Sequence, residues 1–412
     1  MATDPAVAAT TVVEMARDGR FTEIEGLFAA PLRAQVSAEA LRAAWAAETS
    51  VKGPVSAVGE PVSEPIQAGL VRVSVPVTCE HGGFTVVMSV DDTGLLNGLR
   101  FAPADIAEWA PPSYARPETF DEYEVTVGAG PLAVPGTLGL PRGGGPRPGV
   151  VLLSGGGPFD RDATSGANKP LKDLAWGLAS RGVAVLRYDK VTHVHAMADD
   201  FTMADEYVPH TVAAVHLLQR RPDVDAARVF VLGHSMGGKA APRVAAAEPS
   251  VAGLVILAGD AQPMHQAAVR VVRYLAALDP AAKAALETIE RQAAVVAGPD
   301  LSPVTPSTEL PFGFSGSYWL DMRGYDPVAT AAALDRPMLI LQGARDYQVT
   351  VEDDLARWKA GLAHRSDVTF RVYEADNHLF FPGAGPSGPA EYEPAQHVDP
   401  AVVADIAEWI AP

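Results

Sequence analysis

Residues Val229–Pro242 read VFVLGHSMGGKAAP, and this stretch decides the fold. Four apolar residues, typical of a buried strand, run into Gly-His-Ser-Met-Gly-Gly and then into an alanine-rich segment that favours a helix. Gly233, Gly237 and Gly238 surround Ser235, and glycines leave no side chain to clash in a tight turn. In a Gly-x-Ser-x-Gly turn between strand and helix, a strained backbone lifts the serine hydroxyl clear of the sheet. The pattern therefore predicts an exposed, reactive Ser235.

Around this turn, short apolar runs alternate with helical segments from about residue 113 to the end. The runs are PGVVLLSGG, GVAVLRYD, RVFVLGHS, VAGLVILAGD and RPMLILQGARD, with TFRVYEAD as a further strand. Strands with near-continuous apolar sequence are buried on both faces, so we predict a mostly parallel sheet covered by helices. From about residue 262 to 335 a long helical insert interrupts the alternation, and we expect it to form a cap over the strand ends.

The first part of the chain follows a different pattern. Its sequence is helical up to about Trp45, with Ser37 as the expected N-cap of the second helix, and it alternates as strands from about Val55. Two helices followed by an antiparallel sheet form a small α+β module that can fold by itself. The proline-rich segment 110–120 is the expected boundary, so we predict an α+β domain over 1–112 and a catalytic domain over 113–412.

Composition limits the possible partners. The formal net charge of −18 argues against binding to nucleic acid or to an anionic membrane, since both require a basic surface. The one cysteine, Cys79, rules out an intrachain disulfide framework and a cysteine-based zinc cluster. No signal peptide is visible, and no stretch approaches the ~18 apolar residues of a membrane span. We expect a cytoplasmic enzyme, and a homo-oligomer is left open.

A serine hydroxyl becomes a good nucleophile only when a base takes its proton and an acid orients that base. In hydrolases with this kind of turn, the acid follows the serine in the chain and the histidine follows the acid. Asp346 comes directly after the strand MLILQG, and His378 follows the next strand. Both are therefore expected at the same sheet edge as Ser235, with Asp260 as the alternative acid.

The other histidines are weaker candidates. His234 adjoins the serine, so its side chain is expected to point elsewhere and to pack near the strand ends. His193 and His195 would suit a metal pair, but no third ligand lies at a familiar spacing, and a loop position is favoured. His210 and His216 lie in a helical stretch and are interpreted as surface or core positions. No metal site is predicted.

The oxyanion that forms on attack needs two backbone N–H donors. One is expected from Met236, directly after the nucleophile, and the other from the loop LLSGGGPFDRD after the first strong strand. Three glycines in this loop allow amides to face inward. Gly156 is the preferred donor, with Gly157 as the alternative and an ordinary glycine-rich turn as the competing interpretation.

These motifs resemble those of the α/β-hydrolase superfamily, and more narrowly its bacterial dienelactone-hydrolase-like and acyl-hydrolase group. Members read GSGPxDRDxT and then NKPxxDLAxGLASRGxAVLRYDK, where this chain has GGGPFDRDATSGANKPLKDLAWGLASRGVAVLRYDK. The resemblance covers about Phe120–Ile410 and implies an α/β-hydrolase fold with a cap insert. The family roles fall on Ser235, Asp346 and His378, with Gly156 and Met236 as oxyanion donors. Many members have His-Gly at the start of the oxyanion loop, where this chain has Ser-Gly.

The resemblance implies hydrolysis of a small-molecule carboxylic ester, or of a thioester or lactone, with no metal or organic cofactor. Alternatives are an acyltransferase or cyclase acting on a natural-product acyl intermediate, a peptidase with the same triad, and a non-catalytic acyl-binding protein. The first domain resembles a cystatin-like module that precedes some of these hydrolases. The candidates to wall an apolar substrate pocket are aromatic, with packing of the cap on the core as the competing interpretation: Phe159, Phe312, Phe314, Tyr318 and Trp319.

Overall fold

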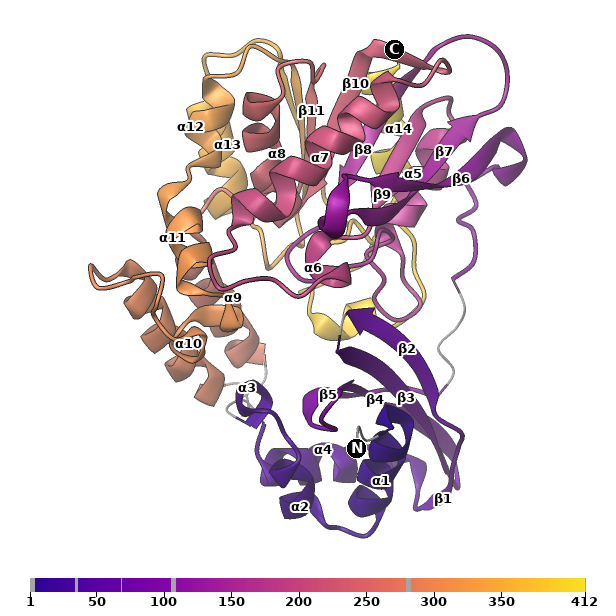
Figure 1. Cartoon of the computed structure of the whole chain (residues 1–412), viewed down its shortest axis with the longest axis vertical. Helices are drawn as coiled ribbons and strands as arrows, with labels where there is room; N and C mark the ends of the chain where they lie inside the picture. The colour runs from indigo at the N-terminus through magenta and orange to yellow at the C-terminus, as the bar shows by residue number, and fades with distance from the viewer. Residues whose placement is uncertain (1–3, 34–35, 68, 105–108, 279–282, 412) are drawn as a thin grey trace. The chain divides into compact units, whose positions relative to one another are not determined.

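The structure is a computed structural model that describes the chain except residues 1–3, 34–35, 68, 105–108, 279–282 and 412. By its internal contacts the chain divides into two compact units (Figure 1). The first is Met1–Glu108 with Val194–Ala196, and the second is Trp109–His193 with Met197–Pro412. Each unit has its own cluster of buried apolar side chains.

The first unit packs helices against an antiparallel sheet of order β1-β3-β4-β5, with β2 pairing with β3. Its strands are β1 (Val55–Val58), β2 (Val62–Gln67), β3 (Leu70–Cys79), β4 (Gly82–Asp91) and β5 (Leu96–Pro103). Its helices are α1 (Pro5–Arg17), α2 (Phe21–Gly26), α3 (Ala30–Arg33) and α4 (Ala38–Lys52).

The predicted α+β class of this unit is confirmed in detail. The Ser37 hydroxyl caps α4 by accepting from the Ala40 amide at 3.2 Å. The alternation on β3 buries Val73, Val75 and Val77 against the helices. The helical segment differs from the expectation, because it contains two further short helices, α2 and α3, between the two predicted ones.

The second unit is built on an eight-stranded sheet of order β13-β12-β11-β10-β8-β9-β7-β6. The six strands from β13 to β9 in this order pair in parallel, and β7 and β6 add an antiparallel edge. The strands are β6 (Phe120–Val127), β7 (Val134–Pro141), β8 (Arg147–Leu153), β9 (Ala184–Tyr188), β10 (Val224–His234), β11 (Leu254–Leu257), β12 (Met338–Gly343) and β13 (Val368–Tyr373). This is the mostly parallel sheet that the apolar runs predict.

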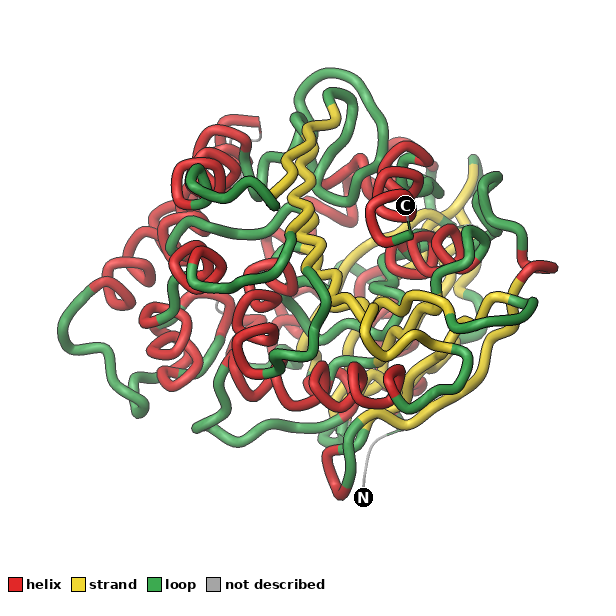
Figure 2. The backbone as a smooth tube through the Cα atoms, turned by 90° about the horizontal axis from the view of Figure 1, so that it is seen from above, coloured by secondary structure: helices red, strands yellow, loops and turns green. Residues whose placement is uncertain are grey.

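Helices cover both faces of this sheet, and Figure 2 distinguishes helices, strands and loops along the chain. The helices of this part of the chain are α5 (Pro170–Ala179), α6 (Val191–Val194), α7 (Met203–Gln219), α8 (Met236–Ala247), α9 (Met264–Leu278), α10 (Lys283–Ala297), α11 (Gly316–Gly324), α12 (Pro327–Ala332), α13 (Ala356–Gly361) and α14 (Pro400–Ile410). A π-helical turn (Val351–Leu355) precedes α13, and short 3-10 turns lie at Pro117–Thr119, Gly130–Leu132, Ser307–Glu309, Pro311–Gly313 and Pro389–Tyr392.

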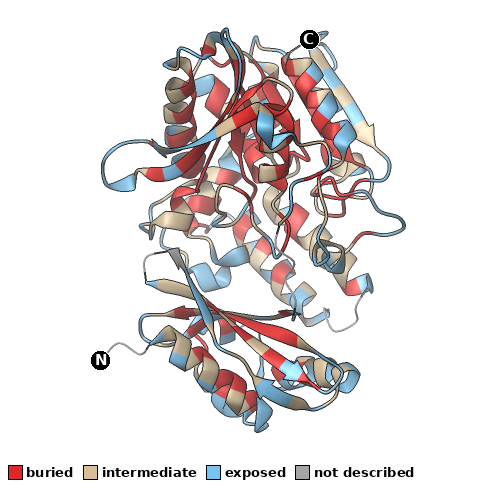
Figure 3. Cartoon of the chain, turned by 90° about the vertical axis from the view of Figure 1, so that its right-hand side faces the viewer, coloured by how far each residue is buried: buried red, intermediate tan, exposed pale blue. Residues whose placement is uncertain are grey.

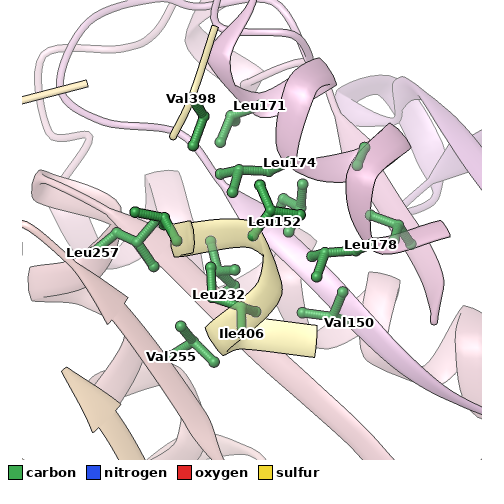
Figure 4. Packing of buried hydrophobic residues seen from close by; sticks show 14 of the residues in the cluster. Val150, Leu152, Leu171, Leu174, Leu178, Leu232, Val255, Leu257, Val398 and Ile406 are labelled. Carbon is green, nitrogen blue, oxygen red and sulfur yellow. The ribbon is translucent and has the colours of Figure 1, made fainter. Parts of the chain in front are cut away.

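The two faces of the sheet carry alternate residues of each strand. On one face, Leu232 and Val255 pack with Leu174 of α5 and Ile406 of α14 (Figure 4). On the other face, Ile256 meets α8, because a Cβ on Gly238 would come within 3.2 Å of its Cγ2. Buried residues accordingly concentrate on the central strands and on the helix faces toward them (Figure 3). Removing apolar area from water on both faces is the main stabilising term of this unit.

The segment predicted as a helical insert, residues 262–335, contains α9, α10, α11 and α12 between β11 and β12. It is held to α8 by polar contacts. Arg243 of α8 forms a bidentate ion pair with Asp321 of α11, at 2.7 and 2.8 Å. The Tyr325 hydroxyl donates to the Lys239 carbonyl of α8 at 3.0 Å. The insert is therefore fixed to α8, the helix that follows Ser235.

Candidate active site

Ser235 lies between β10 and α8 in a strained backbone conformation, with φ 56° and ψ −122°. The neighbouring glycines are required by close approach of the backbone. A Cβ on Gly233 would lie 2.2 Å from the Gly237 carbonyl oxygen, and a Cβ on Gly237 would lie 2.6 Å from the Ser154 carbonyl oxygen. No side chain fits at either position, so the sequence pattern marks a turn that only glycine allows.

The imidazole of His378 joins Ser235 to Asp346. Its Nε2 lies 3.1 Å from the Ser235 Oγ, and its Nδ1 lies 2.7 Å from the Asp346 Oδ2. Because the carboxylate only accepts, Nδ1 carries the proton and Nε2 is left to accept from the hydroxyl. The three residues follow the C-terminal ends of β10, β12 and β13. The structure thus brings together the three side chains that the chain order predicts.

Three donors hold the Asp346 carboxylate besides the imidazole. Its Oδ1 accepts from the Gln348 amide at 2.7 Å and the Val349 amide at 2.9 Å. Its Oδ2 also accepts from the Gln342 side chain at 3.2 Å. Burial lowers the pKa of His378, but the Asp346 carboxylate outweighs burial, so that the pKa of His378 lies above its ordinary value. The sequence does not predict the contact of Gln342 with Asp346, because Gln342 lies in an otherwise apolar strand.

Asp260, the alternative acid, is buried at the end of β11. Its Oδ2 has no hydrogen-bond partner among the described residues, and the imidazole Nδ1 of His378 is bound to Asp346 instead. Burial raises the pKa of Asp260 to about 6, against the opposing effect of Lys239. The geometry therefore favours Asp346 over Asp260 as the partner of the histidine.

His234 supports the loop that carries His378. Its Nε2 donates to the His378 carbonyl at 2.8 Å, and the two rings lie with their centroids 4.7 Å apart. Burial, followed by the nearby His378, lowers the pKa of His234 to about 3. A neutral His234 packs at the strand ends, as expected from its position beside the serine.

The remaining candidate histidines lie apart from this arrangement. The Nδ1 of His193 lies 3.0 Å from the Pro158 carbonyl oxygen, the Nε2 of His210 lies 2.7 Å from the Leu132 carbonyl oxygen, and His216 pairs with Glu248. Within the described part of the chain, no group of three or more His, Cys, Asp or Glu residues is arranged to hold a metal ion.

The glycine-rich loop after β8 lies directly against Ser235. A Cβ on Gly155 would come within 3.2 Å of the Ser235 Cβ, and a Cβ on Gly156 within 3.1 Å of the Met236 Cε. The Gly155 carbonyl accepts from Lys190 Nζ and from the Tyr207 hydroxyl, both at 2.9 Å. In a trans peptide the C=O and N–H point in opposite directions, so the Gly156 N–H points away from these two donors.

Lys190 and Tyr207 belong to a buried polar network that the sequence analysis did not find. Lys190 pairs with Glu206 at 2.9 Å, and Tyr318 of α11 donates to the other oxygen of the same carboxylate at 2.5 Å. The Tyr318 hydroxyl also lies 3.4 Å from the Met236 Sδ. The sequence shows only two charged residues here, Lys190 after the strand AVLRY and Glu206 in the next long helix.

The aromatic candidates for a substrate pocket occupy different environments. Tyr318 and Trp319 are buried, and the Trp319 indole donates to the Pro311 carbonyl at 3.2 Å. Phe312 is 55% exposed, and Phe314 packs against the Tyr318 ring with centroids 4.6 Å apart. Phe159 lies beside the glycine-rich loop, because a Cβ on Gly157 would come within 3.1 Å of its ring.

The chain is similar to several known proteins. The model of the family described as serine aminopeptidase, S33, matches residues 168–382. Esterase EstD of Thermotoga maritima is 36% identical over 388 residues, which cover 92% of this chain and 89% of that protein. Monoacylglycerol lipase of Mycolicibacterium smegmatis is 28% identical over 188 residues, 44% of this chain and 61% of that protein. The solved structure of Est1E from Butyrivibrio proteoclasticus aligns with a TM-score of 0.46 at 16% identity, covering 70% of this chain and 97% of that one.

Of the helices in the described ranges, none combines the length and the apolar character that crossing a membrane requires.

Proposed function

This chain belongs to the serine aminopeptidase S33 family of α/β hydrolases, and from that premise we propose that it hydrolyses carboxylic esters through an acyl-enzyme on Ser235. The observation that carries the proposal is the continuous relay from the Ser235 hydroxyl through His378 to Asp346. The relative named Esterase EstD, which matches most of this chain, supports an ester as the substrate.

The reaction has two steps. In the first, Ser235 Oγ attacks the ester carbonyl carbon while His378 Nε2 takes the hydroxyl proton. The resulting tetrahedral intermediate collapses as the C–O bond to the alcohol breaks, and the imidazolium returns its proton to the leaving oxygen. In the second, water attacks the acyl-enzyme, giving its proton to His378, which then protonates Ser235 as the acid leaves. Asp346 stays ionised throughout and stabilises the imidazolium.

The oxyanion of both tetrahedral intermediates would be bound by the backbone N–H groups of Gly156 and Met236. The support for Gly156 is the orientation of its peptide, since Lys190 and Tyr207 hold the carbonyl on the opposite side. The support for Met236 is its place at the N-terminus of α8, where backbone N–H groups are unpaired and the helix dipole favours negative charge. The nearby ammonium of Lys190 also polarises the Gly155–Gly156 peptide and strengthens its N–H as a donor.

Removing the Tyr207 hydroxyl is expected to loosen this loop. Tyr207→Phe removes one of the two donors to the Gly155 carbonyl. We therefore expect kcat to fall at least about tenfold, but by less than the roughly 10²- to 10³-fold that is lost when an oxyanion donor itself is removed. KM should change little, since the loop acts on the intermediate. Steady-state kinetics on p-nitrophenyl butyrate measures both constants.

The matched control for that variant is Tyr188→Phe. It also removes a buried tyrosine hydroxyl, but that hydroxyl bonds to Thr211 at 2.8 Å and does not touch the loop. If the two variants lose kcat equally, the Tyr207 effect is general destabilisation, and the assigned role of the loop is wrong.

The pH profile follows from the state of His378. The imidazole must be unprotonated to accept the serine proton, and its pKa lies above the ordinary value of 6.5. We therefore expect kcat/KM to fall as pH is lowered, with a midpoint above 6.5. In Asp346→Asn the residual activity should show a midpoint at lower pH, because the carboxylate raises the pKa of His378. A wild-type midpoint below the ordinary value would contradict this.

The ester assignment can be separated from its main alternative by a panel of substrates. We expect hydrolysis of p-nitrophenyl esters from acetate to octanoate, with thioester and lactone analogues included, and negligible turnover of an amino-acid p-nitroanilide. A fluorophosphonate probe should add one covalent adduct to the protein. Faster turnover of the anilide than of every ester would support a peptidase, and an unlabelled protein would support acyl binding without catalysis. No observation favours acyl transfer or cyclisation.

Cytoplasmic location and a homo-oligomer remain predictions, as do a cap role for the insert, the division of the chain into two domains and a pocket walled by Phe159, Phe314, Tyr318 and Trp319. Cys79 is a buried, free thiol whose pKa is raised by burial, which is consistent with an inert core position in the first unit.

A further inference from the structure

A second feature of the Trp109–Pro412 unit lies one helical turn beyond the nucleophile. A cavity, enclosing roughly 600 Å³ of space in part open to solvent, lies between α8 and the insert. Its walls are formed by side chains of α8, the insert and α13. The charged residues and the histidine of this wall are Lys239, His265, Arg323, Asp326 and Arg357.

The charge of this cavity is opposite to that of the protein. The chain has 50 acidic and 32 basic residues, whereas the cavity lining has three cations, Lys239, Arg323 and Arg357, and one carboxylate. That carboxylate, Asp326, is already engaged, because its Oδ1 caps α12 by accepting from two backbone amides at 2.9 Å. A cationic recess in an otherwise acidic protein selects an anion.

Lys239 is the central group of this wall. Its side chain is buried, with the residue 1% exposed, yet the hydrogen bond that fixes its ammonium is a long one, 3.3 Å to the Gln262 carbonyl. An ammonium has three N–H donors, and among the described residues no carboxylate lies within 4.0 Å of this one. Burial lowers the pKa of Lys239, while Asp260, Asp354 and Asp326 oppose burial from a greater distance. An anion in the cavity would offset this cost of burying the charge.

Arg323 and His265 of the wall are suited to the same ligand. Arg323 is oriented by its Nη1, which donates to the Val296 carbonyl at 2.9 Å and to the Gly298 carbonyl at 2.8 Å. Burial, then Arg323 and Lys239, lower the pKa of His265, so its neutral ring has one N–H to donate. The cavity therefore offers ammonium, guanidinium and imidazole N–H donors to an oxyanion.

We propose that this cavity binds a free carboxylate on the acyl part of the substrate, so that the preferred substrates are half-esters of dicarboxylic acids. The inference rests on the ester hydrolysis proposed above. Ser235 is the N-cap of α8, and the Lys239 amide in the first turns of this helix donates to the Ser235 carbonyl at 3.0 Å, so the two residues lie about 6 Å apart along the axis. The acyl group stays on Ser235 after the alcohol leaves. An acyl chain of a few carbons would be long enough to span this separation.

The test compares monoethyl adipate with ethyl hexanoate, which have six-carbon acyl chains that differ in the terminal carboxylate. The purified full-length protein is assayed by pH-stat at pH 7.5. We expect kcat/KM to be higher for monoethyl adipate by about 10- to 100-fold, the effect of one charge-assisted hydrogen bond. Adipate itself should inhibit competitively.

The variant Lys239→Met keeps an unbranched side chain, one atom shorter, and removes its charge. It should lower the ratio of the two kcat/KM values at least tenfold. Because both substrates are measured on one preparation, the ratio does not depend on the fraction of folded protein. If Lys239→Met does not fold, Arg357→Gln at the exposed rim of the cavity should lower the ratio in the same direction. Arg273→Gln is the matched control, because Arg273 is an exposed cation of the insert that pairs with Glu290 outside the lining.

Equal wild-type kcat/KM values for the two esters would overturn this inference and leave the proposed ester hydrolysis intact. A preference for monoethyl adipate that survives in both cavity variants would also overturn it. Failure to hydrolyse any ester in the panel, together with no fluorophosphonate labelling, would overturn the proposed function first and this inference with it.

Discussion

Replacing Ser235 with alanine is expected to reduce kcat on p-nitrophenyl butyrate about 10⁶-fold, because the nucleophile and the proton that His378 accepts are both removed. The variant should fold, since alanine is smaller than serine and the strained backbone at this position is held by the close packing of Gly233 on Gly237. Steady-state kinetics measures the loss. Intact mass spectrometry after fluorophosphonate treatment shows whether the adduct is lost as well.

Ser250→Ala is the matched control for this experiment. Ser250 lies on the surface after α8, where its hydroxyl bonds to Glu248 at 2.6 Å, and it should keep both the activity and the label. A Ser235→Ala protein that is still labelled and still turns over ester at the wild-type rate would place the nucleophile elsewhere.

Replacing Asp346 with asparagine is expected to lower kcat by about 10³- to 10⁴-fold. The reason lies in the donors around the carboxylate. The amides of Gln348 and Val349 require an acceptor at the Oδ1 position, so the asparagine carbonyl would take that place. Its NH₂ would then face His378 Nδ1, which would have to accept. The imidazole proton would move to Nε2, where it blocks transfer from Ser235.

Asp260→Asn is the control for the acid, and it should cause a much smaller loss because no hydrogen bond joins Asp260 to His378 within the described chain. Circular dichroism and thermal unfolding should show that both variants keep the fold. If the outcomes were reversed, with Asp260→Asn inactive and Asp346→Asn active, the acid role would pass to Asp260.

The sequence predicts the arrangement of Ser235, Asp346 and His378 well because its signals are local. Ser235 is marked by glycines that a tight turn demands, and Asp346 and His378 each follow a recognisable buried strand. The parallel order of those strands then brings the three residues to one edge. The fold class likewise follows from local signals, namely the short apolar runs and the helical segments between them.

What the sequence does not predict depends on contacts between distant segments. Lys190, Glu206 and Tyr207 form one network with the Gly155 carbonyl only after β9 and α7 pack against the loop that follows β8. Single charged residues in apolar segments carry no partner in their own neighbourhood. The cationic cavity is likewise assembled from α8, the insert and α13, whose relative placement no periodicity reveals.

The hydrogen bond from Tyr318 to Glu206 has a consequence for protein engineering. Tyr318 belongs to the insert, while Glu206 pairs with the lysine that fixes the glycine-rich loop. Transplanting a foreign insert to change selectivity would leave a buried carboxylate oxygen without its phenol. Such a chimera would lose turnover as well as change preference, unless the graft also restored a hydroxyl at that place.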